Sequence, residues 1–309
     1  MSGLIVVAAA MQAFPAEPDV TKEEPAAQSN AFDRLTAMVP LPEMNLMPSL
    51  GWLTPTNLLA PHFYINPEFR SAAPSRGKMD DDRPHMYLYA TAVVDTPSAG
   101  SFGMGYWSDT ALTKRLSSRH RRLLYENDAI PFYRYKWNFN NEWSLQTDAI
   151  LDLKYFSGYK DEYRFGWHYF TDAAFYGRLD NPYIVPYTLI RRMLHPDSRF
   201  DFRLGALRTF RLPWNLTLTP GLYSDGGSEE QVRRRYGPRP DGSSYRPGFN
   251  AITTFIRIAR PISRHISIYA GIEQFDIVRD AARRAEKRRK SPEARRDITI
   301  AVFGITAWF

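Results

Sequence analysis

The chain has 309 residues, enough for one large domain or two small ones, and aromatic residues make up 14% of it. It contains no cysteine, which excludes a disulfide framework, cysteine-ligated zinc, an iron–sulfur cluster and thiol catalysis. No uncharged apolar stretch reaches about 18 residues, which excludes a bundle of membrane-spanning helices.

The first residues have features of an export signal. Residues 4–11 form a short apolar run, followed by small residues that allow cleavage near Ala13 or Ala16. No Lys or Arg precedes the run, so the basic region of such a signal is missing. We expect a signal peptide over residues 1–16.

Residues 17–60 differ in composition from the rest of the chain. They are rich in Pro, Ala and Asn, which predicts a flexible leader, although a plug is possible for 45–70. Through residue 60 there are six acidic and two basic residues, or net −4. With a net charge of +7 for the whole chain, residues 61–309 therefore carry +11.

From about residue 85 onward the dominant hydrophobic period is two. In residues 143–156, for example, Trp143, Leu145 and Leu151 alternate with Ser144, Gln146 and Asp152. Such runs are longer than the strands of soluble sheets, and they match the roughly 9–11 residues of a tilted transmembrane strand. Aromatic residues at the ends of the apolar faces suit a water–lipid boundary.

The connections between these runs alternate in length. Short ones are expected at Gly158–Asp161, Leu212–Trp214 and Pro261–Arg264, and long polar ones at 177–198, 224–247 and 278–296. Short turns on one side and long loops on the other are typical of an outer-membrane β-barrel.

The final segment, 297–309, alternates up to its last residue, with Phe303, Ile305 and Phe309 on one face. In this it resembles bacterial outer-membrane β-barrel proteins, whose last strand ends in Phe or Trp. Ala307 departs from the pattern, because an aromatic residue is common there. The resemblance implies an outer-membrane location, an antiparallel barrel over 61–309, and recognition of Phe303, Ile305 and Phe309 by the barrel-assembly machinery.

Counting back from Phe309 gives ten strands: 297–309, 264–277, 249–260, 215–224, 199–211, 162–176, 143–156, 131–140, 101–107 and 86–94. Eight to twelve are possible, and twelve requires 61–70 or part of 177–198 to pair. Residues 109–127 have the leucine spacing of a helix and fall on the periplasmic side in this count.

Polar residues on the opposite face of these runs are expected to point into the barrel. This polar lumen set mixes both signs of charge and favours an interior closed by ion pairs, with a narrow polar pore as the alternative. It consists of Arg134, Lys136, Asp148, Asp152, Arg164, His168, Asp172, Asp201, Arg203, Arg257 and Glu273.

The segment 278–296 has nine basic and three acidic residues, or net +6. If it faces outward, it can bind the phosphates of lipopolysaccharide, because Arg binds phosphate well. A solvated charged loop is the alternative, and we do not expect nucleic-acid binding. The basic loop residues are Arg283, Arg284, Lys287, Arg288, Arg289 and Lys290.

No catalytic, cofactor or metal motif stands out in the sequence. We therefore expect a non-enzymatic outer-membrane barrel of structural, surface-binding or narrow-channel type, with outer-membrane lipids and lipopolysaccharide as its partners. Two alternatives stay open: an outer-membrane enzyme acting on lipid or peptide at the barrel rim, and a soluble all-β ligand-binding protein. The solute and the oligomeric state do not follow from the sequence.

Overall fold

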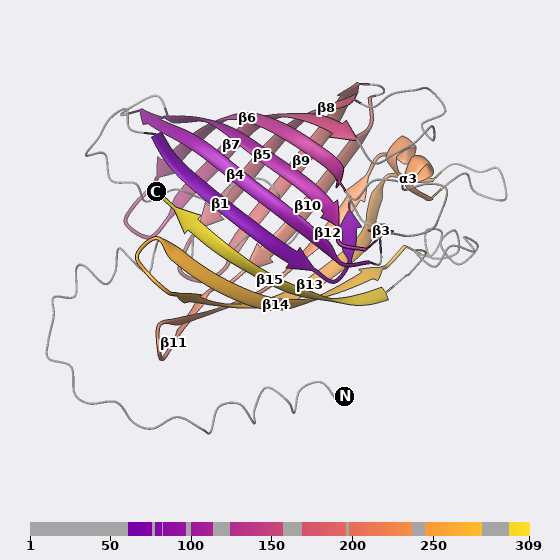
Figure 1. Cartoon of the computed structure of the whole chain (residues 1–309). Helices are drawn as coiled ribbons and strands as arrows, with labels where there is room; N and C mark the ends of the chain where they lie inside the picture. The colour runs from indigo at the N-terminus through magenta and orange to yellow at the C-terminus, as the bar shows by residue number, and fades with distance from the viewer. Residues whose placement is uncertain are drawn as a thin grey trace, which may run out of the picture.

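The computed structural model describes residues 61–75, 78–81, 83–96, 100–113, 124–156, 169–195, 198–236, 245–279 and 297–309. Twelve long antiparallel strands form a closed barrel (Figure 1). They are β1 (Pro61–Arg70), β4 (His85–Thr96), β5 (Gly100–Ala111), β6 (Leu124–Asn138), β7 (Ser144–Phe156), β8 (Tyr169–Asp180), β9 (Val185–His195), β10 (Phe200–Leu207), β12 (Leu216–Gly227), β13 (Gly248–Pro261), β14 (Ile266–Ile277) and β15 (Asp297–Trp308).

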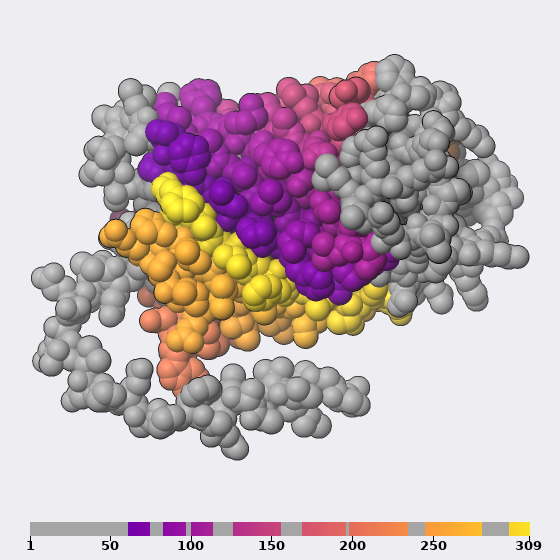
Figure 2. Space-filling view, viewed as in Figure 1, coloured from indigo at the N-terminus to yellow at the C-terminus, as the bar shows by residue number. Residues whose placement is uncertain are grey.

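Each strand of the barrel pairs with the next one along the chain, and the ring closes where the first strand meets the last. At this seam Tyr64 of β1 lies opposite Trp308 of β15, and Arg70 lies opposite Val302. Figure 2 shows the two strands side by side, β1 in indigo and β15 in yellow. A closed ring leaves no long strand with an unpaired edge, which is the requirement for a sheet that crosses a bilayer.

The period of two in the sequence becomes an inward and an outward face. On β13, Thr253, Phe255 and Arg257 are buried inside the barrel, whereas Ile252 and Ile256 are exposed on its outside. Outward residues are large and apolar around the ring, including Phe63, Leu151, Leu204, Leu222, Ile272 and Phe303. The barrel therefore has a polar and aromatic interior and an apolar outer wall.

The two ends of the barrel differ. One end, here called the short-turn end, holds the start of β1, the end of β15, and the connections 139–143, 181–184 and 262–265. Longer connections lie at the opposite, long-loop end, together with the hairpin of β2 (Ala73–Ser75) and β3 (Lys78–Asp81) and the helix α3 (Glu229–Tyr236) (Figure 1). Short turns are periplasmic in barrels of this kind, so β15 ends on the periplasmic side.

One short strand, β11 (Phe210–Leu212), extends past the short-turn end and pairs only with β12. Helix α3 at the other end begins after Ser228, whose carbonyl accepts a hydrogen bond from the Val232 amide. The acidic residues Glu229 and Glu230 occupy the first turn of the helix, where they suit its dipole. Val232 and Gln231 point toward the barrel and are buried.

The prediction of an antiparallel barrel is confirmed, and the count of ten is low by two. Both segments that were set aside as optional form strands: 61–70 is β1, and most of the predicted loop 177–198 is β8 and β9. Pro67 and Pro186 interrupt these segments in the sequence and hide their alternation. In the structure Pro67 faces outward, as part of β1, which has a paired strand on each side.

The helix predicted over 109–127 is wrong for the residues that the structure describes. Residues 109–111 end β5 and residues 124–127 begin β6, and both lie at the long-loop end and not at the periplasmic one. The side was wrong because the omitted strand β9 reversed the direction of every strand before it. Residues 114–123 lie outside the described residues, as do the short connection predicted at Gly158–Asp161 and part 162–168 of a predicted strand.

Candidate functional site in the barrel interior

The interior contains a closed ring of four buried charges beside the seam. Arg70 donates to Glu68 at 3.0 Å and to Glu273, and Arg257 donates to Glu273 at 2.8 Å. The ring is completed by the Arg257 and Glu68 side chains, whose nearest charged atoms are 3.3 Å apart. Two guanidinium groups and two carboxylates cancel, so the ring is neutral although it is shielded from water.

Neutral polar groups extend the hydrogen bonding of this ring. The Tyr269 hydroxyl donates to Glu68 at 2.6 Å and lies 3.1 Å from the Asn66 side-chain oxygen. The Asn66 amide donates to the Thr306 hydroxyl at 2.9 Å. The ring and these partners come from β1, β13, β14 and β15, so they hold together the strands on both sides of the seam.

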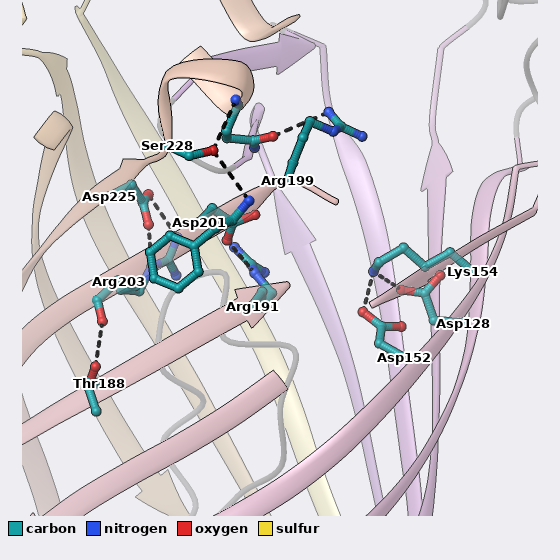
Figure 3. Close-up of polar contacts among 12 residues, drawn as sticks. Asp128, Asp152, Lys154, Thr188, Arg191, Arg199, Asp201, Arg203, Asp225 and Ser228 are labelled. Carbon is teal, nitrogen blue, oxygen red and sulfur yellow. Dashed lines mark hydrogen bonds and ion pairs between the residues drawn. The ribbon is translucent and has the colours of Figure 1, made fainter. Parts of the chain in front are cut away.

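A second set of pairs lies on β9, β10 and β12, which follow β13 around the barrel (Figure 3). Arg203 binds Asp225 through two hydrogen bonds, at 2.7 and 2.9 Å, and its guanidinium lies 3.8 Å from the centre of the Tyr223 ring. Arg191 donates to Asp201 at 2.6 Å. Above them, Arg199 donates to Gln231 of helix α3 at 3.2 Å, so the helix is tied to the mouth of the barrel.

Lys154 lies among carboxylates on β6 and β7 (Figure 3). It donates to Asp128 at 2.8 Å, forms an ion pair with Asp152, and lies 3.4 Å from Glu126. Asp172 on β8 is directly opposite Asp152 in the strand register and is also buried. This cluster near the long-loop end carries more negative than positive charge.

Toward the short-turn end, Arg134 and Asp148 form a pair with two hydrogen bonds, at 2.8 and 2.7 Å. The Gln146 amide donates to the same carboxylate at 3.2 Å. Arginine and carboxylate therefore meet in fork geometry in two of these pairs, Arg134–Asp148 and Arg203–Asp225, which fixes both side chains in place.

One histidine of the interior is paired with a carboxylate. The His85 ring lies 2.5 Å from Asp109 near the long-loop end, a pairing that can orient an imidazole. Among the residues that the structure describes, no three His, Asp or Glu side chains are arranged to hold a metal ion.

Aromatic rings cover inward-facing glycines at four places. Phe132 lies opposite Gly103, Tyr187 opposite Gly205, Phe255 opposite Gly221 and Tyr269 opposite Gly304. A methyl group on any of these glycines would lie within 2.3 Å of a ring atom. The missing side chains therefore let the rings lie flat against the wall, where they pack with their neighbours.

The structure places most of the predicted lumen set inside the barrel. Arg134, Asp148, Asp152, Asp172, Asp201, Arg203, Arg257 and Glu273 are buried, and Lys136 is half-buried at the short-turn end. Arg164 and His168 lie outside the described residues, as does the predicted basic loop from Arg283 to Lys290. Phe303, Ile305 and Phe309 are exposed on the outer wall.

Several interior charges were not in the predicted lumen set. Glu68 and Arg70 were missed with β1, and Asp128 was missed because it directly follows the supposed helix. Asp225 lies one residue beyond the predicted strand end. Lys154 could have been found from the sequence, because it follows Asp152 by two residues and so shares its face.

The side chains on the outer wall show what surrounds the barrel. Ile256 is 54% exposed, and residues of its kind surround the ring, so a water-soluble all-β protein does not fit this surface. In the described part of the chain, no helix has the length and apolarity needed to cross a bilayer. The closed strands do cross it, and the protein is a β-barrel of the bacterial outer membrane.

Comparisons with known proteins find distant structural likenesses and no match in sequence. No family model matches the chain, and no curated protein sequence matches it either. Among solved structures, the KdgM porin is 11% identical over 80% of this chain and 99% of its own, with a TM-score of 0.43. The NanC porin is 11% identical over 80% and 98%, with a TM-score of 0.44. The transport unit of the autotransporter AIDA-I from Escherichia coli is 12% identical over 93% and 100%, with a TM-score of 0.40.

Proposed function

We propose that this protein is a membrane-spanning scaffold with a sealed interior, which acts through the surfaces at its ends and not by passing solutes. The observation that carries the proposal is the complete burial of charged side chains at several different levels of the barrel. Arg70, Arg257, Glu273 and Asp148 each have 0% of their surface accessible to water. A side chain that lines a water-filled passage exposes part of its surface to that water.

The packing around these charges agrees with a sealed interior. Tyr64, Tyr87, Tyr89, Phe132, Tyr187, Tyr223 and Phe255 belong to one buried cluster that contacts most strands of the barrel. Twelve strands enclose more space than eight, where side chains alone fill the interior, and less than the 16 or so strands of a wide porin. Large aromatic rings and paired arginines fill the interior of a barrel of this intermediate width.

A narrow channel for small ions is the second candidate. It is favoured by the polar groups that recur along the interior, from Lys136 and Gln146 near the short-turn end to Lys154 near the other. In this view the ion pairs form a constriction and not a seal. The two functions make opposite predictions for conductance.

Planar-bilayer recording of the full chain separates them. We expect the wild-type barrel to insert without steady conductance steps. The double variant Tyr223→Ala/Phe255→Ala removes two interior rings and should conduct. Its conductance would show that the assay detects barrels that have inserted into the bilayer. Its matched control, Leu222→Ala/Ile256→Ala, trims neighbouring residues on the outer wall and should stay silent. Steady steps in the wild-type protein and in this control would reject the sealed interior and favour the channel.

A further inference from the structure

The outer wall contains arginines that differ from those inside. Arg208 follows β10, Arg260 is near the end of β13, and Arg264 is in the turn that follows β13. All three are exposed at the short-turn end, and none of them forms an ion pair with a carboxylate of the described residues. Arg208 lies over the Phe210 ring, 4.9 Å from its centre.

Strand alternation places two of these side chains on the lipid-facing wall. Arg260 shares the outward face of β13 with Ile252 and Ile256, and Arg208 continues the outward face of Leu204 on β10. Between them runs β12, which presents Leu216 and Leu218 outward. The two residues therefore lie on either side of β12 at different levels: the Arg208 amide donates to the Pro220 carbonyl at 3.1 Å, whereas Ala259, the neighbour of Arg260, lies opposite Thr217.

In the part of the chain that the structure describes, no Asp or Glu on this side of the wall offsets them. The segments 202–224 and 251–272, which form this side of the wall, contain no Asp or Glu. On the opposite side of the same rim, by contrast, Asp95, Glu142 and Asp180 lie in or beside the turns. One sector of the rim is therefore basic, and we define the basic rim sector as Arg208, Arg260 and Arg264.

Apolar side chains surround this sector. Trp214 at the tip of the β11–β12 turn is 62% exposed, and Ile262 in the β13–β14 turn is 59% exposed. Tryptophan favours the boundary between hydrocarbon and headgroups, and Arg extends its charge into the same layer. A basic group in this layer meets the phosphates of lipids, to which a guanidinium donates paired hydrogen bonds.

We propose that the basic rim sector binds the headgroup of an anionic phospholipid in the membrane leaflet at the short-turn end. The lipid phosphate lies between the levels of Arg208 and Arg260, close to Leu218, its chains run along the wall toward Leu222, and Arg264 adds charge at the rim. This inference depends on the barrel crossing the membrane. It does not depend on whether the interior is sealed, because every residue involved is on the outside.

Native mass spectrometry of the full chain tests the proposal, with phosphatidylglycerol and phosphatidylcholine of the same chain length as competing probes. Near an anionic membrane surface each Arg contributes roughly fivefold in affinity. We therefore expect Arg208→Gln/Arg260→Gln to lose roughly tenfold or more of the preference for phosphatidylglycerol. Arg208→Lys/Arg260→Lys keeps the charge and should keep most of it.

The control Arg233→Gln/Arg246→Gln removes the same charge from exposed residues at the long-loop end. It should leave the preference unchanged. An equal loss in this control would show a nonspecific effect of net charge, and an unchanged preference in Arg208→Gln/Arg260→Gln would show that the lipid binds elsewhere. Either result would overturn the proposal. A heat-dependent gel shift checks that each variant is folded. If Arg208→Gln/Arg260→Gln does not fold, the lipid preference of Arg208→Lys/Arg260→Lys is compared with that of the wild-type protein.

Discussion

Arg257 and Arg260 are three residues apart on β13, yet they occupy opposite environments. Arg257 points inward, has no exposed surface, and contacts Glu68 and Glu273. Arg260 points outward and contacts no carboxylate of the described residues. An arginine side chain thus stabilises the interior at position 257, and at position 260 it remains available to lipid and water. The strand period alone decides which role each arginine has.

The contrast applies to the whole molecule. Six inward arginines of the described strands each pair with a carboxylate, namely Arg70, Arg134, Arg178, Arg191, Arg203 and Arg257. A buried charge without a partner is costly, so inward arginines require acids on neighbouring strands. Outward arginines at the rim can use lipid phosphates and water instead. An inward arginine therefore requires a carboxylate partner in the protein, whereas an outward arginine at the rim does not.

The largest expected effect comes from removing an inward arginine. Arg257→Met should lower the free energy of unfolding by about 3–5 kcal/mol, because it leaves Glu68 and Glu273 buried with one cation in place of two. Urea unfolding of the full chain in lipid vesicles, followed by tryptophan fluorescence, measures this loss. A cost below about 1 kcal/mol would mean that water reaches the ring and that the interior is open at this level.

An intermediate effect is expected from an inward glycine. Gly221→Ala would place a methyl group 2.3 Å from the nearest atom of the Phe255 ring, so the ring must leave the wall. Overpacking of this kind costs about 1–3 kcal/mol. Gly177→Ala is the matched control, because the nearest atom to its methyl group would be 3.4 Å away. The same unfolding assay should show a clear difference between the two variants, and equal costs would contradict the role of the close ring contact.

The smallest effect on stability is expected on the outside. Arg260→Gln should change the free energy of unfolding by less than about 0.5 kcal/mol, because no ion pair is lost. Measured beside Arg257→Met in the same vesicles, it tests the contrast within one strand. A loss comparable to that of the inward arginine would mean that the stability of the barrel depends on its lipid contacts as much as on its interior.

Most of the fold could be predicted from the sequence because strands with two different faces leave a clear pattern. Residues 143–156 alternate without interruption, and the structure makes them β7 with only the first residue removed. The pattern failed at β9, where outward Arg192 and inward Leu189 and Met193 reverse the usual polarity. No local rule compensates for this reversal, because only neighbouring strands show that the segment is paired.

The interior was predictable one side chain at a time but not as a set of pairs. Alternation placed Arg257 and Glu273 inside, but their partners Glu68 and Arg70 are about 200 residues away along the chain. Which acid meets which base depends on how far each strand slides against the next. That shift comes from the closure of the whole ring, and no local stretch of sequence contains it.

The position of the four-charge ring beside the seam has a consequence for how the barrel is completed. Glu68 and Arg70 are on the first strand, whereas Arg257 and Glu273 are on strands near the end of the chain. These two halves meet only when β1 docks on β15. If the docking strand slipped by one residue, Glu68 and Arg70 would point toward lipid. Arg257 and Glu273 would then stay buried without their partners. Only the correct docking of β1 on β15 therefore neutralises all four charges.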